Sequence, residues 1–100
     1  MLEERIRLLK RELIEYATLC ESMVEKVIKG LLEKEKDYLL EVIEKDEPKT
    51  DRYDLNLDEK CIQLLAQFQP MAIDLRTILM MLEINRDLER IGDLSVDMSK

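Results

Sequence analysis

Apolar side chains alternate at spacings of four and three residues through the first quarter of the chain. They are Leu2, Ile6, Leu9, Leu13, Tyr16, Cys20, Met23 and Val27. This heptad spacing lines them up along one side of an α-helix. A parallel row widens the apolar face, and it comprises Ile14, Ala17, Val24, Ile28 and Leu31. A face of this width packs against two neighbouring helices rather than one.

Residues that end or begin helices divide the sequence into three helical segments, predicted over residues 2–33, 37–67 and 71–99. Gly30 precedes a polar run at 33–36, and Asp37 can cap the next helix. Gln69 precedes a proline, which disfavours the helical conformation and ends the second segment. Long helices with short connections predict an all-α fold, an antiparallel three-helix bundle of the up-down-up, spectrin-repeat-like type. At 100 residues the chain holds one such domain, residues 1–100.

Pro48 interrupts the second segment. A proline inside a helix removes one backbone hydrogen bond and kinks the helix. We therefore expect a kinked but continuous helix. The alternative is a break before Pro48, with the proline at the first position of a new helix.

The composition excludes several functional classes. Asp and Glu outnumber Lys and Arg by 23 to 16, and the net charge of −7 opposes nucleic-acid binding. No apolar run is long enough to span a membrane and no signal peptide is visible, so we expect a cytoplasmic protein. Cys20 and Cys61 lie among apolar residues and are expected to be buried, reduced thiols. The chain has no His, no phosphate-binding glycine loop and no nucleophile motif, so we do not expect an enzyme.

Two pairs of carboxylates recur at a spacing of four residues, which places each pair on one helical face. Glu89 and Asp93 form one pair, and Glu47 and Asp51 form the other. Reflection through a turn at residues 69–70 brings both pairs to one height in the bundle. In a chain this acidic about five such pairs are expected by chance. A solvated acidic face therefore remains the alternative to a metal site.

The chemistry of a metal site here would be that of hard oxygen ligands. Such ligands suit Mg²⁺, Mn²⁺, Ca²⁺ or iron rather than structural zinc. Three arginines, Arg76, Arg86 and Arg90, lie near these acids and could bind phosphate. We expect them instead to form surface ion pairs. Their expected partners are Asp74, Asp87 and Glu83.

Three blocks in the second half of the chain resemble the signature of the PhoU family of phosphate-uptake regulators. They are Leu64-Leu65-Ala66, Gln69-Pro70-Met71-Ala72-Ile73-Asp74-Leu75-Arg76 and Asp87-Leu88-Glu89-Arg90-Ile91-Gly92-Asp93. The resemblance implies a three-helix repeat whose Glu(Asp)-x-x-x-Asp motifs hold metal cations. Multinuclear iron is the implied cofactor, with Mg or Mn as alternatives.

The family motif can be placed on this chain residue by residue. The matching metal ligands are Glu47, Asp51, Glu89 and Asp93. The surroundings of Pro48 carry an extra residue relative to the family, so Asp46 could replace Glu47 as a ligand.

The resemblance also implies a function and partners. PhoU-like proteins act in negative regulation of the phosphate-starvation response, through contacts with the phosphate ABC transporter ATPase subunit and a sensor histidine kinase. That role implies a cytoplasmic protein, peripheral at the inner face of the membrane, without membrane insertion. The family carries two repeats and this chain one, so it is either the first half of a longer protein or a homodimer, and we expect a homo-oligomer. The rival functions are a structural helical adaptor without metal and a metal-dependent phosphate-processing enzyme.

Overall fold

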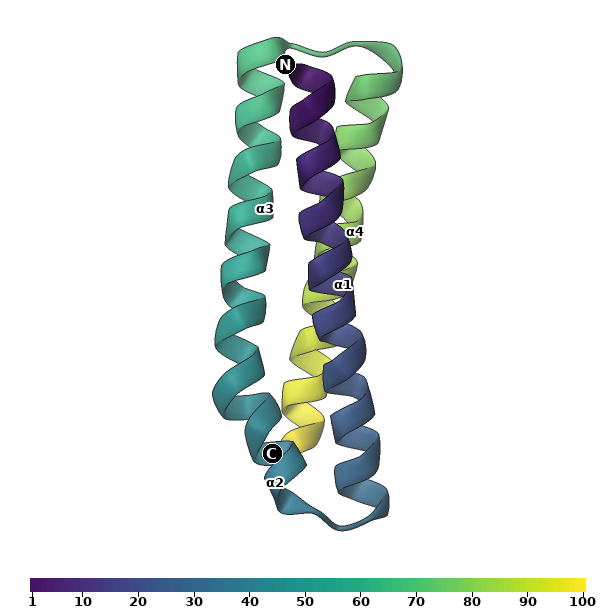
Figure 1. Ribbon diagram of the computed structural model, residues 1–100, viewed down its shortest axis with the longest axis vertical. Coiled ribbons are helices and arrows are strands. Elements are labelled where there is room, and N and C mark those ends of the chain that lie inside the picture. The colour runs from purple at the N-terminus through teal and green to yellow at the C-terminus, as the bar shows by residue number, and fades with distance from the viewer.

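The computed structural model describes residues 1–100, and it is a slender bundle of three antiparallel helical segments (Figure 1). The elements are α1 (Leu2–Leu32), α2 (Lys36–Glu41), the π-helix η1 (Val42–Asp46), α3 (Glu47–Phe68) and α4 (Ala72–Ser99). Helices α2, η1 and α3 follow one another without a gap and form the second segment. The bundle measures 50 × 19 × 18 Å, with α1 and α4 running in the same direction. The predicted all-α, up-down-up bundle is confirmed.

Tight packing and backbone conformation explain where the segments end. A Cβ atom added to Gly30 would lie 2.7 Å from Cδ2 of Leu39, so the glycine lets α2 approach the end of α1. At the other end of the bundle, Gln69 is left-handed with φ 45° and caps α3. Met71 is extended, and α4 begins after it. Three residues therefore separate α3 from α4, as many as the predicted helix bounds leave between them.

The helix is continuous through Pro48, as expected, and a wide turn precedes the proline. In η1 the N–H of Glu47 donates to the carbonyl of Val42, five residues back. A π-turn holds one more residue than an α-turn and accommodates an insertion without breaking the helix. It also eases the clash that the proline ring would make with a carbonyl four residues back. An extra residue of the kind expected near Pro48 would be accommodated in η1.

The core divides into two clusters along the bundle. The larger contains eleven buried residues from all three segments, among them Tyr16, Leu57 and Ile78. The smaller lies near the α1–α2 connection and contains Met23, Val27, Val42 and Val96. The buried polar side chains are Asp46, Thr50, Asn85, Ser95 and Ser99. Buried polar side chains are uncommon, so η1, α3 and α4 are the elements to examine for a functional site.

Candidate metal-binding face between α3 and α4

A buried amide on α4 organises two carboxylates of α3. Asn85 is fully buried, and its Nδ2 donates to Oδ1 of Asp54 at 2.8 Å and to Oδ1 of Asp58 at 3.0 Å. Its Oδ1 is also buried and has no hydrogen-bond partner. An unpaired buried oxygen costs free energy unless a donor or a cation reaches it. The polar centre of the α3–α4 interface is therefore incompletely satisfied by the protein's own groups.

Negative charge accumulates around this amide. The pKa of Asp54 is raised, first by burial and then by the charges of Glu89, Asp58 and Asp51, although the hydrogen bond from Asn85 acts in the opposite direction. Asp54 and Asp58 have the four-residue spacing of the pairs chosen from the sequence. They were missed because the chosen pairs matched one another in register. The polar positions facing Asn85 were the signal that could have found them.

The predicted ligands lie around this centre without forming one cluster. Glu89 and Asp93 are exposed on α4, and Asp51 is exposed on α3, whereas Glu47 is partly buried at the start of α3. Glu89 and Asp51 both act on the pKa of Asp54, so they lie near it. No three Asp, Glu or Cys side chains converge closely enough to hold a metal ion in this conformation. The four-ligand set stays a prediction.

The contacts across α3 and α4 lie close to the register expected from the sequence. Gly92 faces Thr50, whose side chain lies 3.9 Å from a Cβ built on the glycine, and Asn85 faces Asp54 and Asp58. These contacts fall within about two residues of a reflection through the connection at 69–71. Asp51 therefore lies near the height of Glu89, and Asp54 lies about one turn further along α3.

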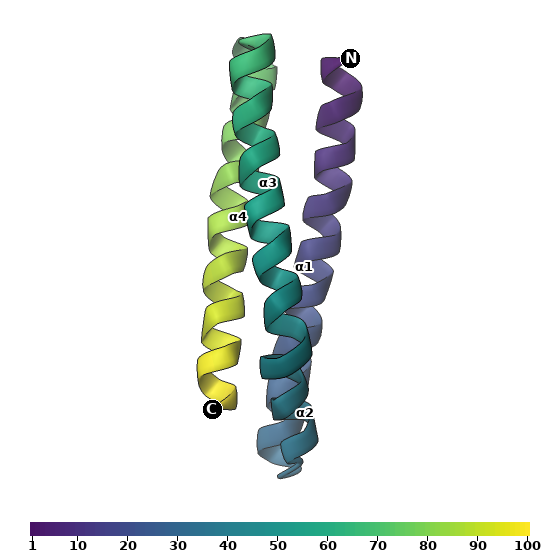
Figure 2. The ribbon, with the colours of Figure 1, turned by 90° about the vertical axis from the view of Figure 1, so that its left-hand side faces the viewer.

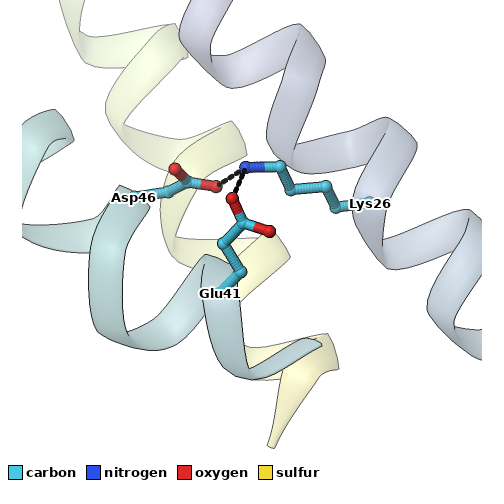
Figure 3. Close-up of polar contacts among 3 residues, drawn as sticks. All are labelled: Lys26, Glu41 and Asp46. Atoms are coloured by element: carbon cyan, nitrogen blue, oxygen red, sulfur yellow. Dashed lines mark hydrogen bonds and ion pairs between the residues drawn. The ribbon is translucent and has the colours of Figure 1, made fainter. Parts of the chain in front are cut away.

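Asp46, the alternative ligand, forms an ion pair with a lysine of α1. Lys26 Nζ lies 2.8 Å from Oδ2 of Asp46 and 3.1 Å from Oε1 of Glu41 (Figure 3). Burial alone would lower the pKa of Lys26, but the hydrogen bonds that its ammonium group donates to Asp46 and Glu41, together with their negative charges, outweigh burial, and the pKa is raised. The ammonium group thus offsets part of the negative charge that η1 and α2 bring to α1.

The expected surface ion pairs of the arginines do not form. The ion pairs of the chain are Arg7 with Glu4, Lys26 with Glu41 and Asp46, and Lys60 with Glu12. Arg76, Arg86 and Arg90 are exposed and belong to none of them. No acid lies at i±3 or i±4 from Arg76, and Arg86 and Arg90 form no ion pair with the acids at i±3, so the three charges stay available on the surface.

Both cysteines are free and buried, as predicted. Burial raises the pKa of the Cys20 thiol to about 11, and burial together with Asp58 raises that of Cys61 to about 11. Thiols with such pKa values stay protonated near neutrality and are poor metal ligands.

No helix is both long and apolar enough to cross a membrane.

Comparison with known proteins shows which family this chain belongs to. The model of the PhoU domain matches residues 13–100, most of the chain. The chain belongs to the PhoU family. Its relatives include PhoU homologues, named phosphate-specific transport system accessory proteins, from Rhizobium meliloti (35% identical over 98% of this chain and 41% of the relative). Others are from Aquifex aeolicus (33% over 84% and 38%) and Clostridium acetobutylicum (34% over 98% and 45%).

The PhoU chain described here spans less than half the length of these relatives. No solved structure matches it.

Proposed function

We propose that this PhoU chain is an accessory and regulatory unit of phosphate transport, acting in negative regulation of the phosphate-starvation response. The observation that carries the proposal is the PhoU match over residues 13–100. The proposed partners are the ATPase subunit of the phosphate transporter and a sensor histidine kinase, at the inner face of the membrane. The unit works by protein contact, not catalysis, and it self-associates. In cells lacking their own PhoU, its expression should restore repression of a phosphate-starvation reporter, and unchanged derepression would contradict this role.

The second part of the proposal is that the α3–α4 face binds hard cations, multinuclear iron or Mg or Mn. Three features support it: carboxylates supply hard oxygen donors, the pKa of Asp54 is raised by burial and by neighbouring negative charge, and Asn85 Oδ1 is unpaired. Glu89 and Asp93 are the proposed ligands from α4. From α3 the candidates are Glu47 and Asp51, together with Asp54 and Asp58. A bound cation would supply the positive charge that these carboxylates lack.

Binding would also require movement of side chains, because the carboxylates do not converge as they stand. Glu89, Asp93 and Asp51 are exposed and free to change rotamer at little cost. Asp54 and Asp58 are held by Asn85 and would need less reorganisation. The α3 pair closest to Asn85 is therefore the better half of the site.

Metal analysis of three double variants tests the site. They are Glu89→Ala with Asp93→Ala, Asp54→Asn with Asp58→Asn, and Glu47→Ala with Asp51→Ala. We expect the first two to lose bound metal, and the third to keep most of it. At a metal concentration of 100 times Kd, binding should add about 2.7 kcal/mol to the stability of the wild-type chain and raise Tm.

The outcomes separate the rival functions. Wild-type protein that holds no metal, with Tm unchanged by added Mn²⁺ or Fe³⁺, would leave the structural adaptor without a metal site as the function. Loss of metal in the Glu89→Ala, Asp93→Ala and the Glu47→Ala, Asp51→Ala variants, but not in the Asp54→Asn, Asp58→Asn variant, would return the site to the ligand set expected from the sequence. Phosphatase turnover that disappears in the Glu89→Ala, Asp93→Ala variant would make the chain an enzyme.

A further inference from the structure

Helix α4 carries a second apolar row on its outward side, next to the row that faces the core. Its positions, at spacings of four and three, are Ile73, Thr77, Met80, Ile84, Asp87, Ile91, Leu94 and Met98. Every apolar member of this row is exposed, from 39% at Ile91 to 77% at Ile73. The core does not need this row, because α4 packs inward through Ile78, Met81, Asn85, Leu88 and Gly92. A 4,3 spacing is the pattern with which one helix packs along another.

Helix α1 extends this surface. A groove of about 300 Å³ runs between the two helices, and its lining is Val24, Val27 and Ile28 from α1 with Ile91, Leu94, Ser95 and Met98 from α4. The row Ile14, Val24, Ile28 and Leu31 on α1 is exposed as well. Together the two rows expose ten large apolar side chains on neighbouring helices. Monomeric proteins rarely expose contiguous apolar patches larger than a few hundred Å².

Charged residues follow the outer edge of the α4 row at a spacing of seven. They are Arg76, Glu83, Arg90 and Asp97, and their charges alternate in sign. All four are exposed and none forms an ion pair within the chain. Charges that flank an apolar row select the partner and the orientation of a helix pair. The alternating charges therefore restrict which partner helix can pack against the α4 row, and in which orientation.

The α4 surface is complementary to itself when two copies run antiparallel. In one register Arg90 meets Glu83 of the second copy and Arg76 meets Asp97 of the second copy, so all charges along the edge are paired. In that same register the apolar rows interleave. Met80 packs against Ile91 of the second copy, and Ile73 against Met98 of the second copy.

Other arrangements bring like charges together or leave the charges unpaired. A shift of one heptad in either direction sets Arg90 against Arg90 of the second copy, or Glu83 against Glu83. In a parallel pair with two-fold symmetry the two charged edges lie on opposite sides of the interface, so none of these charges is paired with another of the row. Asp87 faces Ile84 of the second copy in the favoured register, and a single polar residue in such a row costs affinity while fixing the register.

We propose that two copies of this chain pair through α4, antiparallel and with two-fold symmetry, and that the α1 row is covered at the edges of the same interface. This deepens the self-association in the proposed function and does not depend on the metal. The carboxylates of the α3–α4 face lie on the side of α4 away from the α4 row. Loss of the dimer and loss of the metal can therefore be told apart.

Charge exchange in the full chain tests the interface, with mass measured by sedimentation over a range of concentrations. The wild type should be a dimer. Arg90→Glu alone, and Glu83→Arg alone, each place two like-charge contacts in the dimer and should raise its dissociation constant roughly tenfold. The double variant, and an equimolar mixture of the two single variants, should recover wild-type dissociation constants. Arg86→Glu, the same change on the same helix outside the row, should have no effect.

The contrary results are equally specific. A wild-type chain that is monomeric at every concentration, or a dimer insensitive to Arg90→Glu, would overturn the proposal. Failure of the mixture to form heterodimers would overturn the antiparallel register. Ile91→Glu, in the middle of the apolar row, gives a second readout: helical content should stay unchanged while the dimer dissociates, and a dimer that survives would exclude this face.

Discussion

Among single residues, Lys26 has the most constrained environment. Its side chain is 21% exposed and bridges Asp46, which is 4% exposed, to Glu41 (Figure 3). A buried carboxylate is tolerated only when it is paired, because burial removes its hydration. Lys26 therefore allows η1 to direct Asp46 into the bundle. The heptad pattern did not predict this pair, because Lys26 lies beside the apolar row and Asp46 takes its place in the bundle only through the π-turn.

Replacing Lys26 with Met should destabilise the protein by about 3 kcal/mol at pH 7, since Asp46 would be left charged and unpaired. Urea denaturation measures the change. Asp46→Asn in the Lys26→Met background should recover part of the loss by removing the buried charge. Lys10→Met, at an exposed position outside any ion pair, is the matched control and should change stability by less than about 0.5 kcal/mol. Equal losses for the two lysine variants would mean that the pair contributes nothing.

At the scale of elements, η1 sets how the second segment meets the other two. One additional residue rotates everything on one side of it by about 100° relative to a regular α-helix. With η1 in place, Val42 is fully buried in the smaller core cluster and Leu57 in the larger. Figure 2 shows α2 following on below α3 at the foot of the bundle, and Figure 1 shows the bend between them. The π-turn, rather than the proline that follows it, sets the rotation of α2 relative to α3.

Deletion of Lys45, an exposed residue of η1, should convert the π-turn into an α-turn and rotate Val42 out of the core. We expect a loss of about 3 kcal/mol, made up of Val42 burial and the pairing of Asp46. The free energy of unfolding in urea measures it. Lys45→Ala keeps the residue count and should be neutral within about 0.5 kcal/mol. A deletion variant as stable as Lys45→Ala would show that the π-turn has no role in register.

At the scale of the whole molecule, each of the three outer grooves has its own chemistry. Polar pairs bridge the α1–α3 groove, where Lys60 and Asn56 both contact Glu12, at 2.7 and 2.8 Å, beside a pocket of about 210 Å³. Carboxylates collect between α3 and α4. The α1–α4 groove is apolar and open. With one groove bridged by polar pairs, one acidic and one apolar, metal binding and self-association are assigned to different sides of α4.

The burial and crowding of Asp54 make the stability of the metal-free protein depend on pH. The folded pKa of Asp54 lies above its ordinary value of 3.8, so the folded state binds this proton more tightly than the unfolded state does. Asp54 therefore costs stability at pH 7, and the cost disappears as pH falls through the interval between the two pKa values. Asp54→Asn should raise stability at pH 7 by up to about 1 kcal/mol, with the gain vanishing near pH 4. Asp51→Asn, at an exposed position, should give a smaller gain, and a pH-independent effect of Asp54→Asn would contradict the account.

The sequence by itself determined the helices and the fold. Heptad spacing, Gly30 and Gln69-Pro70 placed the helix ends within one residue of the observed ones, because these signals act within one or two turns of the chain. It also indicated an acidic face and the family. Only the tertiary structure decided which side chains meet across α3 and α4, where Asn85 holds Asp54 and Asp58 together. Only the packed bundle, too, showed which carboxylate faces Asn85, which is bound by Lys26, and which apolar row remains without a neighbour, because these are contacts between helices that no single helix specifies.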